Sequence, residues 1–259
     1  SSGLGVWFGQ FFHNLGGGAD SFSWYWTPMD VWVPEANTFL TLYHNPLHLL
    51  ALALIVLTML LWLKSAEQNS WRHSLLAGAT AFTLILIHPY HIPTILLMPL
   101  VWILAWRFTK ANVKLWPLIK RYLVLAGLLT PAIVYHIYLL VFDFSRKENW
   151  AQSFGFTPHP VVALASYGLP LVLAILGWRI MKAKQTISPK FLFCLVWFFV
   201  GFFLLYAWFL NWPRRLSQGL QVPLVVLATV GLDYLWRKWE RYLPASRLAS
   251  VFIIILIAL

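Results

Sequence analysis

Long apolar stretches separated by short polar segments repeat along most of the chain. Each stretch is close to the roughly 20 residues that a helix needs to cross a bilayer, and none alternates over about ten residues like a membrane β-strand. The pattern predicts an all-α, polytopic transmembrane bundle with at least seven spans and a truncated eighth that starts near Leu248. The expected spans are 45–63, 74–87, 93–106, 122–142, 160–178, 191–210 and 220–236.

Proline and polar residues mark the expected helix ends. His88, Pro89 and Pro93 interrupt an apolar stretch that runs from about 71 to 108. One uninterrupted helix of that length would be about 57 Å long at 1.5 Å per residue, so we expect the chain to turn back at this break. Pro131 is expected to kink the fourth span.

Residues 1–42 differ in character from the rest. They are rich in aromatic residues and glycine, and they contain Asp20, Asp30 and Glu35 but no Lys or Arg. We expect an interfacial segment of loops and short helices here, followed by a single membrane domain over 43–259. The chain lacks an initial Met and stops inside an apolar stretch, so we expect a fragment of a longer protein.

The basic residues predict the orientation in the membrane. Of the 19 Lys and Arg residues, 15 fall in the expected loops 64–73, 107–121, 179–190 and 237–247. Cytoplasmic loops collect Lys and Arg, so these loops are expected inside and residues 1–42 outside. The predicted location is the plasma (inner) membrane, with several crossings.

Composition supports a membrane protein and excludes other classes. The chain is 60% hydrophobic and 10% charged, with a mean hydropathy of +0.71, whereas globular domains are about 25% charged. A soluble domain, a disordered chain and a coiled coil are therefore excluded. The net charge of +11 is explained by the basic loops, so the expected partner is the lipid bilayer and no nucleic acid.

Two groups of polar residues are expected at the outer face, near helix ends. Glu35 and His44 lie in the polar segment 34–46, which leads into the first span. His88 and His91 lie at the outward turn. Substrate binding by these side chains competes with helix capping and with a simple interfacial turn. Their spacing matches no metal motif, so no metal and no cofactor are predicted.

Arg214 and Arg215 are two of only four basic residues expected outside, and they precede the seventh span. Arginine binds phosphate through two parallel hydrogen bonds, and a helix N-terminus also favours an anion. These two residues are therefore candidates for binding a lipid phosphate. Contact with lipid headgroups and ion pairs with Asp143 or Glu148 are the alternatives.

The segments PEANTFLTLYHNP (34–46), HPYHIP (88–93) and WPRRLSQGLQVPL (212–224) resemble those of uncharacterised bacterial proteins near the GT-C-type integral membrane glycosyltransferase superfamily. The resemblance implies glycosyl transfer from a polyprenyl-phosphate-linked sugar at the outer face. It also implies a catalytic Asp in the first outer loop, which is expected to precede Ser1, so the catalytic residue is unknown. A non-enzymatic lipid or solute transporter and a structural membrane subunit are the alternative functions.

Overall fold

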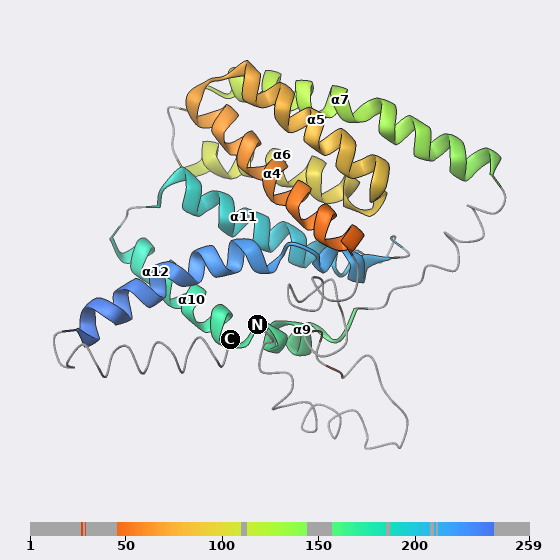
Figure 1. Cartoon of the computed structure of the whole chain (residues 1–259). Coiled ribbons are helices and arrows are strands. Elements are labelled where there is room, and N and C mark those ends of the chain that lie inside the picture. Colours follow the sequence, from red (N-terminus) through yellow and green to blue (C-terminus); the bar gives the residue numbers. More distant parts are fainter. Residues whose placement is uncertain are drawn as a thin grey trace, which may run out of the picture.

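The computed structural model describes residues 27, 29, 46–109, 113–143, 157–184, 187–207, 210 and 212–240. All regular secondary structure in this part of the chain is helical, which confirms the all-α prediction (Figure 1). The main helices are α4 (Pro46–Gln68), α5 (Trp71–Ile87), α6 (Ile92–Thr109), α7 (Leu115–Phe142), α9 (Pro160–Ser166), α10 (Gly168–Ala183), α11 (Pro189–Leu204) and α12 (Gln221–Trp239). Two short 3₁₀ helices, η2 (Pro89–His91) and η3 (Pro213–Ser217), precede α6 and α12.

Several of these helices have the length and composition of membrane spans. Within the described residues, four segments qualify: Pro46–Gln68, Pro89–Thr109, Leu115–Phe142 and Pro213–Trp239. The helices α5 and α11 are apolar but shorter, and α9 with α10 forms one bent pair. The chain is thus a helical protein of the multi-pass membrane type, whereas the seven crossings, the eighth span and the outer segment stay predictions.

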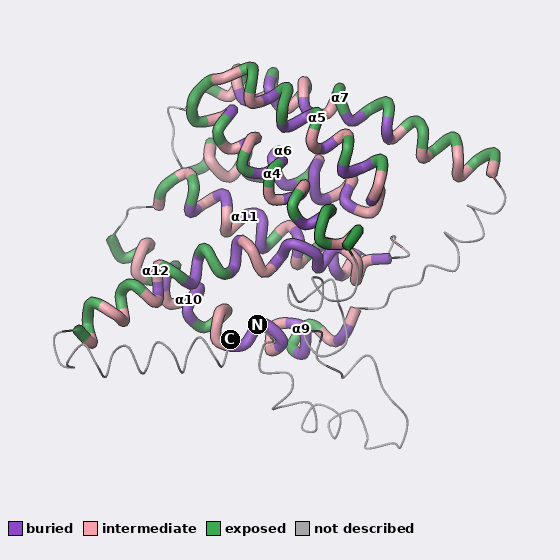
Figure 2. Tube along the Cα trace, in the orientation of Figure 1, coloured by how far each residue is buried: buried purple, intermediate pink, exposed green. Residues whose placement is uncertain are grey.

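The surface of the helices also fits a lipid environment. Large apolar side chains stay exposed on α7, among them Val134, Val141 and Phe142, the last of which is 72% exposed. Figure 2 shows exposed positions recurring along the whole of α7. In water such a surface would be unfavourable because each exposed apolar group costs free energy, but in lipid it carries no such cost.

Small and hydroxyl residues bring α4 and α5 close together. Ser65 and Ser74 share a buried hydrogen bond of 2.5 Å, and the Thr58 hydroxyl donates to Thr80 at 3.0 Å. Small residues allow close approach of helix backbones within a membrane, and hydroxyl groups there find partners across helices. Neighbouring α7 packs on α5 along one edge of the molecule (Figure 1).

A second close approach joins α10 and α12, which cross at Gly177 and Gly231. A Cβ atom on Gly177 would lie 2.7 Å from the Leu227 carbonyl oxygen. Only glycine therefore fits at this crossing without a shift of the two helices.

The expected turn at 88–93 is confirmed: α5 ends at Ile87, and α6 runs back across the molecule (Figure 1). The expected fifth span, 160–178, is broken, because α9 and α10 meet at 91°. Gly168, at the bend, has φ +47, a conformation that glycine adopts without steric cost. The expected sixth span also ends early, at Leu204.

The fourth span differs at its start. It begins at Leu115, not near residue 122, and the helix continues through Pro131 to Phe142. Arg121 consequently lies within α7 and not in a loop.

Alternating helix directions create two distinct ends of the bundle. At one end, the start of α4, the end of α5 and the segment before α12 meet, and hydrogen bonds from Gln218 connect them. We call this the polar end. At the other, the end of α4 meets the start of α11 through the Glu67–Lys190 ion pair, and we call it the basic end.

Candidate functional site

The break after α5 places His88 and His91 inside the polar end. Pro89 begins η2 because its fixed φ suits a first helical position and it needs no backbone donor. The His88 backbone N–H still donates to the Leu84 carbonyl at 2.7 Å, so the chain leaves α5 without losing that bond. Both histidines end up buried, with His88 4% exposed and His91 fully enclosed.

Five rings then assemble into what we call the ring cluster: His48, His88, Tyr90, His91 and Trp212. His88 is at its centre, stacked on His91 at 5.1 Å between ring centres and edge-on to His48 at 5.2 Å. Tyr90 lies 5.2 Å from His88 and 5.4 Å from Trp212. The cluster thereby joins α4, the break after α5 and the segment that leads into η3.

Gln218, the residue directly after η3, fixes the orientation of the histidines in this cluster. Its side-chain Nε2 donates to the His48 backbone carbonyl at 2.5 Å, and its Oε1 lies 2.9 Å from His91 Nε2. The carbonyl can only accept, so the amide nitrogen must face it and the amide oxygen must face His91. His91 therefore carries a proton on Nε2, and Gln218, only 2% exposed, holds that tautomer in place.

The three imidazoles of the cluster each have a ring nitrogen, Nδ1, without a hydrogen-bond partner among the described residues. Nδ1 of His48, His88 and His91 is buried, and none has a hydrogen-bond partner among the described residues. Buried polar atoms are normally paired, and an unpaired one costs about 1–3 kcal/mol. Three such atoms in one cluster are unusual, and hydroxyl groups of a ligand could complete their hydrogen bonds only if the side chains that enclose them moved apart.

Arg215 contributes positive charge beside these rings. Its guanidinium carbon lies 4.2 Å from the centre of the Tyr90 ring, a cation–π contact. No carboxylate of the described residues forms an ion pair with Arg215. The expected alternative, an ion pair with Asp143, is therefore absent for Arg215 in the described structure.

The charge distribution follows from this packing. Burial lowers the pKa of His88 most, followed by His91, His48 and the nearby Arg215 guanidinium, and together they bring it from 6.5 to about 3. His88 is thus uncharged at neutral pH, and at that pKa it is a weak proton acceptor. The site combines an arginine cation with a neutral imidazole, which favours an anion with attached hydroxyl groups.

The arginine pair does not lie at the N-terminus of α12. It lies on η3, whereas α12 begins only at Gln221, after a turn in which Gly219 has φ +85. The expected help from the α12 dipole is therefore wrong, since that effect fades within one helical turn. The aromatic face of Tyr90 holds Arg215 instead. Arg214 is half-buried on the same 3₁₀ helix.

The structure brings three of the predicted site residues together: His88, His91 and Arg215. Glu35 and His44 lie outside the described residues. His48 and Gln218 belong to the site but were not predicted as site residues. Proximity of His48 to Asn45-Pro46 was the one available signal, and nothing in the sequence points to Gln218.

An apolar groove of about 400 Å³ lies between α4, α11 and α12, and no residue of the ring cluster lines it. Val56 and Trp197 line its middle, and Val222, at the start of α12, lines it toward the polar end. Leu63 and Val230 line it toward the basic end. A groove with this lining and direction suits a hydrocarbon chain that lies along the helices.

No three His, Cys, Asp or Glu side chains of the described residues are placed to hold a metal ion. Comparisons with protein-family models, with curated proteins and with solved structures found no match for this chain.

Proposed function

We propose that the polar end binds the phosphate of a polyprenyl-phosphate-linked sugar and that the chain belongs to a membrane glycosyltransferase acting at the outer face. One observation carries the proposal: Arg215, without a carboxylate partner among the described residues, lies beside buried imidazoles with open Nδ1 atoms. The guanidinium suits a phosphate, and the imidazoles suit the sugar hydroxyls.

The apolar groove supports the lipid part of this ligand. It starts near Val222, four residues after Gln218, so a phosphate at Arg215 and a chain in the groove can belong to one molecule. The helices around it have the composition of membrane spans, and the isoprenoid chain of a lipid carrier would exchange one apolar environment for another. The resemblance to GT-C enzymes points to the same ligand class.

The residues suggest a division of roles. Arg215 would bind the donor phosphate and stabilise the charge that develops as the phosphate departs. A base must also remove a proton from the acceptor hydroxyl. His88 does not suit that role, since a group with a pKa of about 3 is a poor base at pH 7. The catalytic base is therefore sought among residues other than His88.

Lipid binding by the purified full chain tests the proposal. Wild-type protein is titrated with a polyprenyl phosphate in neutral detergent at fixed salt. We expect Arg215→Ala to weaken binding by about 1.5–3 kcal/mol, the contribution of a charge-assisted hydrogen bond, and Arg215→Lys to recover part of it because lysine lacks the planar fork. Arg214→Ala is expected to weaken binding in the same direction.

The matched control is Arg179→Ala, which removes an exposed arginine of α10. It should leave the affinity unchanged. Equal affinities for wild type and Arg215→Ala, with both proteins folded, would remove the phosphate role of the polar end.

A lipid or solute transporter is the second candidate, and the bent pair α9–α10 favours it. Broken helices often line the substrate path of transporters, and these two helices meet at 91°. Movement of a fluorescent lipid from one leaflet to the other in protein-containing vesicles, without any sugar transfer, would support a transporter function over an enzyme function.

A further inference from the structure

A second polar cavity lies at the basic end, separate from the ring cluster. It has a volume of about 520 Å³ and is lined by the end of α4, the second half of α6, the start of α7 and Pro189 of α11. Ala66, in its wall, is 18 residues beyond His48 on the same helix. At 1.5 Å per residue the two sites are roughly 27 Å apart.

Arg121 is the unusual residue of this cavity. It lies in the second turn of α7, lines the cavity and is only 2% exposed. Its Nη1 donates to the Pro117 carbonyl at 3.1 Å, its Nη2 donates to Asn69 Oδ1, and its guanidinium carbon lies 5.3 Å from the centre of the Trp71 ring. Its Nε has no partner, and no carboxylate pairs with it, among the described residues.

A buried guanidinium without a counter-charge is unfavourable. Removing such an ion from water costs several kcal/mol even after the protein relaxes, and uncharged oxygens offset only part of that cost. The surrounding structure nevertheless fixes Arg121. Asn69 ends α4 in the left-handed conformation, with φ 55, and its side chain accepts from the guanidinium. A fixed, uncompensated cation that lines a cavity is what an anionic ligand requires.

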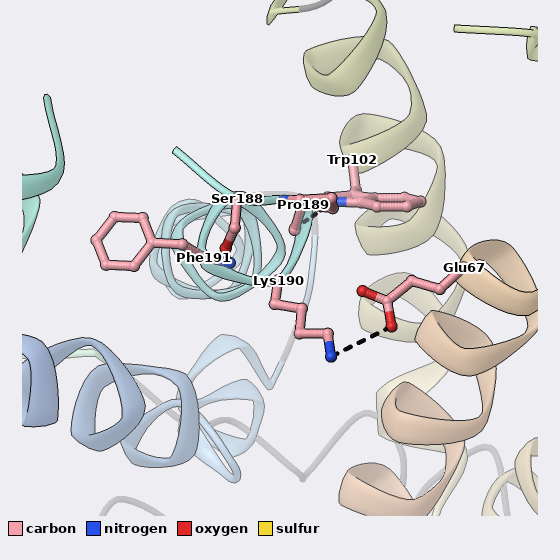
Figure 3. A network of polar contacts seen from close by, with 6 residues as sticks. All are labelled: Glu67, Trp102, Ser188, Pro189, Lys190 and Phe191. Atoms are coloured by element: carbon pink, nitrogen blue, oxygen red, sulfur yellow. Dashed lines mark hydrogen bonds and ion pairs between the residues drawn. The ribbon is translucent and has the colours of Figure 1, made fainter. Parts of the chain in front are cut away.

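The rest of the lining strengthens this reading. Exposed Lys114 adds a second positive charge. Among the described residues that line the cavity, Glu67 is the only acidic one, and Lys190 of α11 forms an ion pair with it at 3.5 Å (Figure 3). The cavity is therefore positive overall.

Two tryptophans give the cavity an apolar wall. Trp102 Nε1 donates to the Pro189 carbonyl at 3.2 Å, which holds the indole against the start of α11 (Figure 3). Trp106 lies next to it, with 5.7 Å between ring centres. Tryptophan and basic residues at the ends of membrane helices are typical of the headgroup region.

We infer that this cavity binds the phosphate of an anionic phospholipid. The phosphate meets Arg121 and Lys114, while the glycerol and the first methylene groups lie against Trp102 and Trp106. A soluble phosphate ester offers the same charge but makes no use of the apolar wall. Anionic lipids of the cytoplasmic leaflet attract basic segments, which agrees with the predicted orientation.

The test is calorimetric titration of the full chain in neutral detergent. The probes are dioctanoyl phosphatidylglycerol, dioctanoyl phosphatidylcholine and inorganic phosphate. We expect phosphatidylglycerol to bind at least tenfold more tightly than phosphatidylcholine, and Arg121→Gln to lose about tenfold or more of that affinity. Lys120→Gln removes a charge from the exposed neighbouring residue, and this variant should bind as wild type does.

Unchanged binding of phosphatidylglycerol by Arg121→Gln would overturn the inference. Inorganic phosphate that binds as tightly as the lipid would overturn the assignment to a phospholipid and indicate a soluble ligand. If Arg121→Gln does not fold, Lys114→Gln replaces it as the test, because Lys114 is exposed at the cavity rim. We expect that variant to lose about threefold in affinity, and wild-type affinity would contradict the inference.

Discussion

Replacement of Gln218 by methionine probes the ring cluster most sharply. Methionine keeps the length of the side chain but removes both amide hydrogen bonds. The His91 Nε2–H then has no partner, whereas the His48 carbonyl lies inside α4 and keeps its bond within the helix. Gln218 is 2% exposed, so water cannot replace the amide. Each buried polar group left unpaired costs about 1–3 kcal/mol. Gln218→Met should therefore lower the free energy of unfolding by about 1–3 kcal/mol.

The assay is unfolding of the purified chain in mixed micelles by increasing dodecyl sulfate, followed by far-ultraviolet circular dichroism. Gln68→Met is the matched control, because Gln68 is exposed at the end of α4. We expect the control to stay within about 0.5 kcal/mol of wild type. Equal stabilities for the two variants would refute the role of Gln218 as the link between His91 and His48.

Three further predictions concern topology, packing and pH. Cysteines introduced at Tyr90 and at Lys114 should react with a membrane-impermeant reagent from opposite sides of the membrane. Gly177→Ala should lower stability by about 1–3 kcal/mol through the clash at the crossing with α12, whereas Gly127→Ala, with open space at its Cβ, should not. His88 binds its proton only near pH 3 in the folded state but near pH 6.5 when unfolded, so stability should fall as pH drops from 6.5, by about 2 kcal/mol between pH 7 and 5.

A specific experimental result would contradict each of these three predictions. Reaction of both cysteines from one side would overturn the span assignment. Equal stability of the two glycine variants would remove the close crossing as a constraint. The pH effect should shrink in His88→Gln, and an equal loss of stability on acidification in that variant would assign the effect to other groups.

The sequence predicts the broad architecture because hydropathy reports directly on burial in lipid. The turn at His88–Pro93 was predictable because two prolines and two histidines interrupt an apolar stretch that is too long for one span. Asp233 and Arg237 form an ion pair, with Arg237 Nε 2.9 Å from Asp233 Oδ2 one helical turn away. Such contacts depend only on local spacing.

Features that depend on the path of the chain were harder to predict. The bend between α9 and α10 does not change the hydropathy, although Gly168 and Pro170 were a visible signal for it. The buried position of Arg121 was missed because positive charge between apolar stretches suggests a loop. Only the early start of α7, at Leu115, places this residue inside the bundle.

Only part of the candidate site was predicted, because some of its contacts are local in sequence and others depend on helix packing. His88 and His91 are close in sequence, so their proximity follows from one turn. Their link to Gln218 spans a separation of 127 residues, and that of Gln218 to His48 spans 170. Contacts of that kind depend on how the helices pack, and hydropathy carries no information about them.

Photo-crosslinking tests whether the polar end holds the phosphate of a polyprenyl lipid. A polyprenyl phosphate with a diazirine next to the phosphate is bound to the full chain, irradiated and mapped by mass spectrometry. We expect crosslinks within 88–92 and 212–218, reduced in Arg215→Ala and competed by unlabelled polyprenyl phosphate. Crosslinks confined to the basic end or to the exposed face of α7 would contradict this expectation.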